Sequence, residues 1–216
     1  IERHESSEVP DFGNGSFEPA HTGRSLLAGC DQWRKIYFAI VVLRDLVGGM
    51  QVVVRHLFIS PGHNFFGHHG QPAGLNPTRE VAEVMCRAGR GIEGDRFFDY
   101  KPDYRGQITF FDHRVYEEMK RHFSLPHLPA GAFRRNVLLE GLDLMAHVGA
   151  RFFVGALEFE GMCESAPCYW MDQAACPGAE QWLKGRGGLR ARILCDGVLK
   201  LGVHAFRVSD AQLNPA

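Results

Sequence analysis

Short apolar runs, each bounded by Gly, Pro or Asp, dominate the sequence from Met50 onward. The first of them, residues 51–59, reads Gln-Val-Val-Val-Arg-His-Leu-Phe-Ile. Similar runs follow at 81–86, 107–111, 136–139, 152–154, 156–159 and 205–208. Such short runs, rich in branched and aromatic residues, are typical of β-strands. Many short strands with few helices predict a mainly β (α+β) barrel or sandwich rather than a parallel α/β sheet.

An Asp-Gly pair marks the best candidate for a hairpin. Asp196-Gly197 separates the apolar runs 191–195 and 198–201. A two-residue Asp-Gly loop suits a type I′ turn, whose two central residues need a positive φ. The pattern therefore predicts that these two runs pair as neighbouring antiparallel strands.

Two helices are expected among the strands. Residues 114–122 place Val115 and Met119 on one face, and Asp112 precedes them as the expected N-cap. A second helix is expected over residues 178–184. It should end at Gly185, because glycine readily adopts the left-handed conformation that stops a helix.

The composition limits the class of protein. A chain of 216 residues can bury a sizeable core, and its net charge of −1 gives no sign of a nucleic-acid or membrane partner. Its six cysteines have irregular spacing and form no C-x-x-C pair, which fits reduced thiols in a cytoplasmic protein better than a disulfide framework. The apolar stretch 36–43 is too short to span a bilayer, which takes about 20 residues.

The first 49 residues differ in composition from the rest of the chain. Up to Gly29 they are rich in Gly, Ser, Glu and Pro, which favours disorder. The sequence begins with Ile1, whereas Met50 opens the first strand pattern. We therefore expect residues 1–49 to be a disordered extension or an over-long reading of the coding sequence, and residues 50–216 to form the functional domain.

Cys168 is the candidate reactive residue. Pro167 fixes the backbone before it, and Tyr169-Trp170 follows with rigid aromatic surface. A thiol acts as a nucleophile or metal ligand only as the thiolate, which nearby Arg or Lys residues favour. The alternative is a buried thiol that serves as a small apolar group, as free cysteines usually do. The neighbouring residues alone leave both interpretations open.

Three basic segments are candidate anion sites, namely 89–96, 134–136 and 184–190. Glycines let a backbone approach an anion closely, and guanidinium groups bind phosphate through two parallel hydrogen bonds. A structural turn, a solvated strand end or a flexible connector would explain them equally well. Although 89–96 contains G-x-G-x-x-G, no βαβ unit surrounds it, so a dinucleotide site is not expected. The histidine-rich segment 61–70 is expected to be a rim loop over a pocket rather than a metal site.

Four motifs in order resemble those of the MOSC domain, which takes its name from the C-terminal part of molybdenum-cofactor sulfurase. They are Gly91-Ile92-Glu93-Gly94-Asp95-Arg96, Arg135-Asn136-Val137, Gly149 to Gly155, and Pro167-Cys168-Tyr169. The similarity covers about residues 52–203, and the segments 59–64 and 106–111 resemble small stand-alone bacterial MOSC proteins. Each motif alone is weak, but four in this order make the resemblance specific.

The resemblance implies a mixed β-barrel with a few peripheral helices and a site for the molybdenum cofactor, a pterin dithiolene that carries a phosphate. Cys168 matches the family cysteine that ligates molybdenum or carries persulfide sulfur, and Asp95 would orient Arg96 or relay a proton. By this resemblance, the expected catalytic residues are Cys168 and Asp95, and the expected cofactor-binding residues are Gly94, Arg96, Arg135, Asn136, Arg186 and Arg190.

Two functions from different classes follow from the resemblance. In the one we favour, Cys168 ligates molybdenum and the protein reduces N-hydroxylated compounds. Its electrons would come from a separate donor protein, because the sequence has no evident flavin, haem or iron–sulfur motif. In the alternative, the protein is a non-redox carrier or sulfur-transfer module that uses a Cys168 persulfide and meets the cofactor's biosynthesis proteins. Pyridoxal phosphate belongs to a desulfurase domain that full sulfurases carry, and residues 1–49 are too few to form one.

Overall fold

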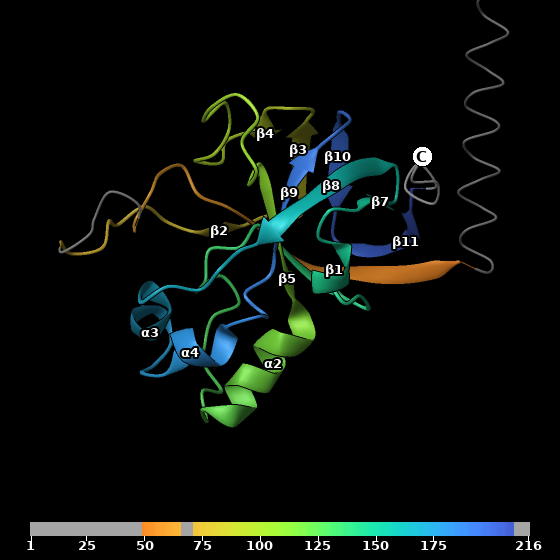
Figure 1. The fold of residues 1–216 in the computed structure, drawn as a ribbon. Coiled ribbons are helices and arrows are strands. Elements are labelled where there is room, and N and C mark those ends of the chain that lie inside the picture. Colours follow the sequence, from red (N-terminus) through yellow and green to blue (C-terminus); the bar gives the residue numbers. More distant parts are fainter. Residues whose placement is uncertain (1–48, 66–70, 210–216) are drawn as a thin grey trace, which may run out of the picture. The chain divides into compact units, whose positions relative to one another are not determined.

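A computed structural model of the chain describes residues 49–65 and 71–209. Strands make up most of the regular structure in this part (Figure 1). The strands are β1 (Met50–Ile59), β2 (Arg79–Glu80), β3 (Glu83–Arg87), β4 (Gly91–Ile92), β5 (Ile108–Asp112), β6 (Val137–Glu140), β7 (Arg151–Val154), β8 (Leu157–Glu164), β9 (Leu189–Ile193), β10 (Gly197–Lys200) and β11 (Gly202–Val208). The helices are α2 (His113–His122), the 3₁₀ turn η1 (Met145–His147), α3 (Trp170–Ala174) and α4 (Ala179–Leu183).

Seven of the described strands close into a barrel in the order β1-β11-β7-β8-β9-β5-β6 and back to β1. Closure depends on β1, which pairs with β11 through its first half and with β6 through its second half. β5 and β6 run parallel, with Phe110 opposite Val137, whereas the other pairs in the barrel are antiparallel. Closure removes the exposed strand edges that an open sheet would leave. The expectation of a mixed β-barrel with a few helices is confirmed.

Strand β5 connects the two apolar clusters of the fold. Every residue of β5 is buried. Phe110 faces the barrel interior, where its ring lies edge-on to Phe159 at 5.2 Å and to Phe152 at 5.8 Å between centroids. Phe111 points the opposite way and joins the cluster under α2, α3 and α4. Since burying one Phe side chain stabilises a fold by about 1.5–3 kcal/mol, β5 ties the helices firmly to the barrel.

The helices lie together on one side of the barrel (Figure 1). Helix α2 begins as predicted at Asp112, whose side chain accepts a hydrogen bond of 2.8 Å from the backbone N–H of Arg114. The predicted second helix is α4, which covers most of the expected range. Helix α3 was not predicted, because its five residues are too few to show a helical period.

The predicted hairpin around Asp196-Gly197 is wrong. Strand β9 pairs with β8 and β5 in the barrel, whereas β10 pairs with β3 in a separate three-stranded sheet. Neither Asp196 nor Gly197 has the positive φ that a type I′ turn needs. The Asp196 carboxylate instead accepts hydrogen bonds from the Ala88 N–H at 2.8 Å and from Arg87 at 3.0 Å. The two residues therefore join two sheets rather than turning one strand onto the next.

The interpretation of residues 1–49 concerns positions that lie, up to residue 48, outside the described residues, and it stays a prediction. The apolar stretch 36–43 lies outside them as well. Within residues 49–65 and 71–209, no helix is long and apolar enough to cross a membrane.

Candidate functional site

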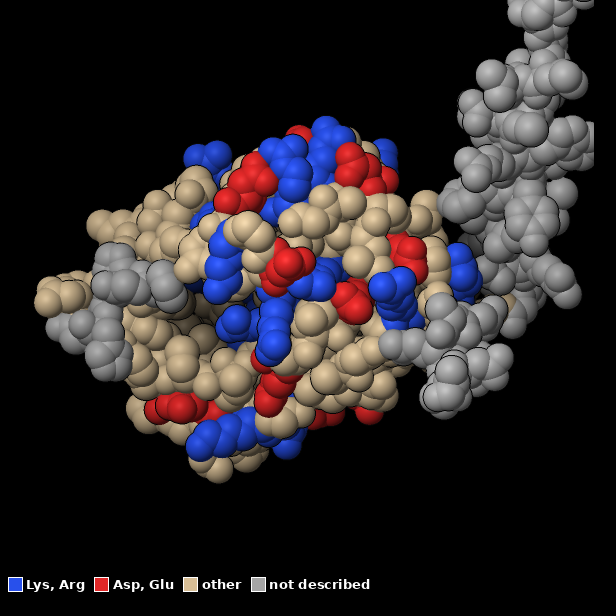
Figure 2. All heavy atoms as spheres, turned by 45° about the horizontal axis from the view of Figure 1, so that its top comes forward, with Lys and Arg blue, Asp and Glu red and all other residues tan. Residues whose placement is uncertain are grey.

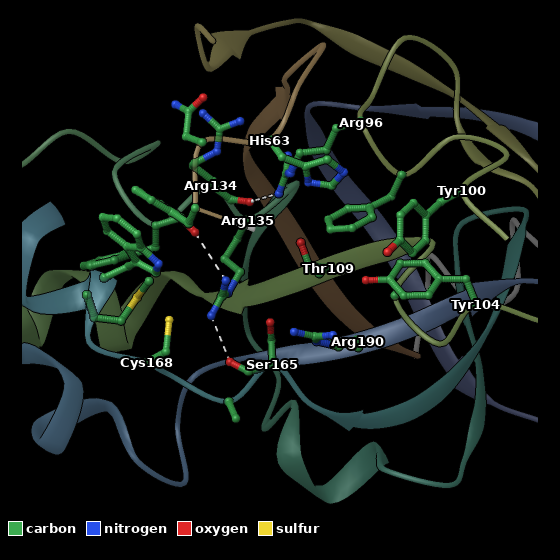
Figure 3. Close-up of a pocket in the computed structure, with 18 of the residues that line it drawn as sticks. His63, Arg96, Tyr100, Tyr104, Thr109, Arg134, Arg135, Ser165, Cys168 and Arg190 are labelled. Atoms are coloured by element: carbon green, nitrogen blue, oxygen red, sulfur yellow. Dashed lines mark hydrogen bonds between the residues drawn. The ribbon is translucent and has the colours of Figure 1, made fainter. Parts of the chain in front are cut away.

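A cavity of about 600 Å³ brings together segments that are far apart in the sequence (Figure 3). Its lining comes from the loop after β1, the loop between β4 and β5, the segment before β6, the segment between β8 and α3, and strand β9. In Figure 3, Cys168 lies on one side of the cavity and Tyr100 and Tyr104 lie on the opposite side, with Arg135 and Arg190 between them. Figure 2 shows this part of the surface as hollowed, with Lys and Arg side chains gathered beside the hollow.

Cys168 lies on the segment that leads from β8 into α3. The residue is exposed and lines the cavity, so its thiol is not the buried apolar group of the alternative interpretation. Its carbonyl accepts a hydrogen bond of 2.8 Å from the Met171 N–H at the start of α3. At the other end of the segment, the buried Ser165 donates its N–H to the carbonyl of Gly188 at 2.7 Å. The thiol is therefore carried by a segment fixed at both ends.

Arg135 binds three backbone carbonyls around the cavity. Its guanidinium donates to Ser165 at 2.8 Å, to Gly187 at 3.1 Å and to Phe133 at 3.3 Å. The pKa of Arg135 is lowered to about 10, mainly by burial and also by the nearby positive charges of Arg190 and Arg96. Arginine keeps its charge at physiological pH. The lowered pKa therefore means that the charged guanidinium of Arg135 is partly buried at an energetic cost, without a partner among the described residues that neutralises it.

Arg134, the neighbour of Arg135, is buried and also lines the cavity. Its guanidinium donates to the carbonyl oxygens of Gly62 at 2.6 Å and Asn76 at 3.0 Å, and its backbone has a positive φ of 54°. Burial and the charge of Arg96 lower its pKa to about 10. Adjacent arginines usually end up in solvent at a strand end, but here both are built into the wall of the cavity.

Asp95 is a buried hydrogen-bond acceptor behind the cavity wall rather than a residue of its lining. Its carboxylate accepts from the N–H groups of Ser60 and Phe97, both at 3.1 Å, and from the guanidinium of Arg96 at 3.2 Å. The preceding Gly94 has a φ of 79°, which the turn requires and which glycine adopts without strain. Asp95 therefore holds Arg96 at the cavity, where the arginine also donates to the Arg134 carbonyl at 3.0 Å.

Asn136 is likewise buried behind the lining. Its side-chain oxygen accepts from the Thr109 hydroxyl at 2.8 Å and the Thr109 N–H at 3.1 Å, and its amide donates to Phe58 and Asp95, both at 3.2 Å. This network ties β5 and β6 to the turn that carries Arg96. Asn136 has no contact with the cavity itself, and Thr109 is the member of the network that lines it.

Arg190 projects from β9 into the cavity. Its Nε is buried and has no hydrogen-bond partner among the described residues. Of the four arginines in the lining, which are Arg96, Arg134, Arg135 and Arg190, only Arg96 has a carboxylate partner in the described part of the chain. The cavity therefore carries an excess of positive charge, and the Arg190 Nε in its wall is buried without an acceptor. Both features suit an anionic ligand.

Arg186 lies away from the cavity. Its guanidinium covers the ring of Trp182 at 4.4 Å from the centroid and is 3.8 Å from the carboxylate of Glu118. Arg90, the other arginine of the glycine-rich segment, pairs with Asp99 at 2.8 Å and lies over Phe98. Arg90 is not among the residues that line the cavity, whereas Arg96 in the same segment is.

The aromatic lining of the cavity was not anticipated from the sequence. Phe97, Tyr100 and Tyr104 pack on one another with centroid distances of 4.9 to 5.5 Å, and the ring of His63 stands edge-on to Phe97 at 4.9 Å. On the other side, Phe65 stacks on Trp170 at 4.7 Å. The rim loop predicted for 61–70 does reach the pocket at His63, while residues 66–70 lie outside the described residues. Two tyrosines and a lysine within the short loop 99–106 were the available signal.

The fold and the site together define a closed β-barrel protein with an exposed thiol beside a cationic cavity. The sequence profile of the MOSC domain matches residues 68–204, and the chain belongs to this family. The family is associated with binding of the molybdenum cofactor. None of the curated protein sequences compared with the chain matches it.

Solved structures show the same fold. The YuaD protein from Bacillus subtilis superposes with a TM-score of 0.56 and 17% identity, over 74% of this chain and 99% of that one. The YiiM protein from Geobacillus stearothermophilus superposes with a TM-score of 0.53 and 17% identity, over 73% of this chain and 75% of that one. At this level of identity the likeness concerns the fold alone.

Proposed function

We propose that the protein binds the molybdenum cofactor in the main cavity and reduces N-hydroxylated compounds there, with Cys168 as the protein ligand to molybdenum. The observation that supports this most is that the Cys168 thiol opens onto the same cavity as four arginines. A thiolate is a soft metal ligand, and guanidinium groups bind phosphate. A cofactor that combines a dithiolene-bound metal with a phosphate needs both kinds of group in one site.

The residues present fit such a group in size and charge. A volume of about 600 Å³ lies within the range of small-molecule and cofactor cavities, about 300–1,000 Å³. The buried Nε of Arg190 lacks an acceptor, and positive charge is held unfavourably at Arg134 and Arg135. An anion would relieve the repulsion between these cations. The same anion should therefore stabilise the fold when it binds.

Each residue then has a defined part in the proposed reaction. Arg190, the remaining N–H groups of Arg135, and Arg96 would hold the phosphate, while Asp95 and Asn136 position Arg96 and Thr109 from behind. Arg186 is left out of this assignment because its guanidinium lies on Trp182. The bound cofactor would supply a metal centre that transfers two electrons.

Proton supply is the other need of this reaction. Reduction of an N–OH group takes up two electrons and two protons, breaks the N–O bond, and releases water and the N–H product. His63, Tyr100 and Tyr104 are titratable groups of the aromatic side of the cavity, where a substrate can lie beside the cofactor. The electrons would come from a separate donor protein, in the cytoplasm.

The test compares the wild-type protein with two cysteine variants, all expressed in a host that makes the molybdenum cofactor. Molybdenum content is measured first, and reduction of a hydroxylamine or amidoxime with an artificial electron donor is measured next. Cys168→Ser should lower activity by more than about 100-fold, because it removes a metal ligand. Cys176→Ser is the matched control, since its thiol packs beside the helices instead of lining the cavity, and it should retain activity.

The sulfur-transfer function is the competing outcome of the same experiment. A wild-type protein that holds stoichiometric molybdenum but reduces neither substrate would end the proposal. Mass spectrometry of the intact protein would then look for one extra sulfur atom on Cys168 after incubation with a persulfide donor. An exposed thiol can accept such a sulfur, so this alternative rests on the same residue but predicts no reduction.

A further inference from the structure

A second cavity of about 520 Å³ adjoins the main one. The two share Lys101, Tyr104 and Arg190, and Arg105 and Cys163 line only the second. In the barrel wall, Arg190 of β9 stands between Thr109 of β5, which lines the main cavity, and Cys163 of β8, which lines the second. The Arg190 side chain therefore reaches both spaces.

The second cavity carries cations that the described residues leave without a carboxylate partner. Neither Arg190, Lys101 nor Arg105 forms an ion pair within residues 49–65 and 71–209. Asp103 also lines this cavity, and its carboxylate pairs with Arg192 at 2.9 Å, so three cations share the lining with one carboxylate that already has a partner. The Lys101 ammonium lies over the rings of Tyr104 at 5.5 Å and Tyr100 at 5.8 Å, which holds the charge near the junction of the two cavities.

Two hydrogen-bond donors point to an oxyanion rather than to a general preference for negative charge. The Arg190 guanidinium lines both cavities and makes no side-chain hydrogen bond to the described residues. Tyr104 faces both cavities, and burial raises the pKa of its hydroxyl, which therefore stays a donor at neutral pH. A guanidinium and a phenol O–H that line the same cavity, together with Lys101 and Arg105, offer several donors to the oxygens of a phosphate or carboxylate.

We propose that the second cavity is an oxyanion subsite, lined by Arg190, Lys101, Arg105 and Tyr104, for a charged group on a molecule that occupies the main cavity. This inference rests on the proposed function, because the molecule is either the cofactor or its substrate. The charged group is a second phosphate if the pterin carries a nucleotide. It is a phosphate or carboxylate on the N-hydroxylated compound if the pterin does not.

The first experiment needs neither cofactor nor activity, and it uses Cys163 as a reporter inside the subsite. Alkylation of each cysteine of the cofactor-free protein by iodoacetamide is followed by peptide mass spectrometry, in inorganic pyrophosphate and in sodium chloride of equal ionic strength. Pyrophosphate should slow alkylation of Cys163 several-fold. Cys176, which lies outside both cavities, should react at the same rate in both solutions.

The matched variant is Lys101→Met/Arg105→Met. Both side chains are exposed, so the variant should fold normally, and the pyrophosphate concentration that half-protects Cys163 should rise about tenfold through loss of charge-assisted hydrogen bonds. Protection that is absent in the wild type, or equal in the variant, overturns the inference. Either result leaves the cofactor proposal intact, because the Cys168 experiment tests that separately.

Two further measurements on the molybdenum-loaded protein identify the source of the anion. Mass spectrometry of the released cofactor shows whether the pterin carries a nucleotide. If it does not, Arg105→Met should raise KM for an N-hydroxylated substrate with a carboxylate by about tenfold and leave a neutral analogue unchanged. A cofactor without a nucleotide, together with equal effects on both substrates, would reject the subsite.

Discussion

The guanidinium of Arg135 is hydrogen-bonded to the backbone carbonyl of Ser165 at 2.8 Å, three residues before Cys168. The same guanidinium binds Gly187, so it joins the segment that carries the thiol to the connector that leads into β9. The resemblance assigned Arg135 to the cofactor alone. The structure gives it a second part, because the residue that offers positive charge to the cavity also fixes the position of the thiol beside it.

Replacing Arg135 by Met should therefore destabilise the protein and loosen the Cys168 segment. The Ser165 and Gly187 carbonyls would lose their donor at a largely buried place, a loss of about 1–3 kcal/mol. Thermal unfolding of the cofactor-free protein measures this loss, and the rate of Cys168 alkylation measures the loosening. An unchanged Tm together with an unchanged alkylation rate would show that Arg135 does not position the segment.

Replacing Arg190 by Met should have the opposite effect on stability. Arg190 makes no side-chain hydrogen bond to the described part of the protein, and its Nε is buried without an acceptor. Its removal relieves that desolvation cost and one repulsion with Arg135, so the cofactor-free protein should gain about 1 kcal/mol. The same variant should bind pyrophosphate and the cofactor more weakly. A variant that loses stability as Arg135→Met does would show that Arg190 is not an uncompensated cation in the cofactor-free protein.

The barrel could be predicted from the sequence because its signal is local. Short strands between turn residues are visible along the chain, and Asp112 marks the start of α2 by a capping bond made within two residues. The pairing of strands is not local. Asp196-Gly197 looks like a hairpin turn from its neighbours, but its carboxylate bonds to Ala88 and Arg87, more than a hundred residues earlier. No window around Asp196 contains that partner.

The candidate site, like the fold, could be predicted from the sequence only in part. The structure brings Arg190, from the basic segment 184–190, to the same cavity as Cys168, Arg96 and Arg135. Motif order identified the last three. It could not separate residues that face the cavity from those that hold them, so Asp95 and Asn136 were assigned with the lining although they lie behind it. Which side of a strand faces a cavity depends on closure of the barrel, and closure is set by contacts across the whole chain.

Asp95 should contribute far more to stability than Asp99, which also pairs with an arginine. Its side chain is 1% exposed and compensates the charge of Arg96, which is 10% exposed. Asp95→Asn would leave that charge buried and uncompensated, which typically costs about 3–5 kcal/mol. Asp99→Asn is the control, because Asp99 pairs with Arg90 in solvent and its loss should change little. Chemical denaturation of the two variants compares them, and equal losses would refute the buried role of Asp95.

His63 should make the protein less stable in acid. Burial lowers the pKa of His63, and the charges of Arg96 and Arg134 lower it further, while Asp95 acts in the opposite direction. Below the unfolded pKa, about 6.5, the unfolded chain therefore binds more protons than the folded one at this residue, and the free energy of unfolding falls as pH drops. His63→Gln should lose less stability than the wild type between about pH 7 and pH 5. If the free energy of unfolding changes equally with pH in the two proteins, His63 is not the source of the acid sensitivity.

Gly187 should be needed because the Cys168 segment packs too closely against it for a side chain, and not because of its backbone conformation. A Cβ at this position would lie 2.6 Å from the Ser165 carbonyl oxygen and 3.0 Å from Pro167, so the Cys168 segment would have to shift. Gly185 in the same connector has a φ of 78° and open space around its Cα, so Gly185→Ala meets backbone strain without a clash. Both variants should lose about 1–2 kcal/mol in thermal unfolding, but only Gly187→Ala should change the alkylation rate of Cys168. Arg135 binds both Ser165 and Gly187. A shift of either segment therefore breaks one of these hydrogen bonds, and the thiol moves with the segment. Equal alkylation rates in the two variants would mean that the thiol is placed by α3 and not by this contact.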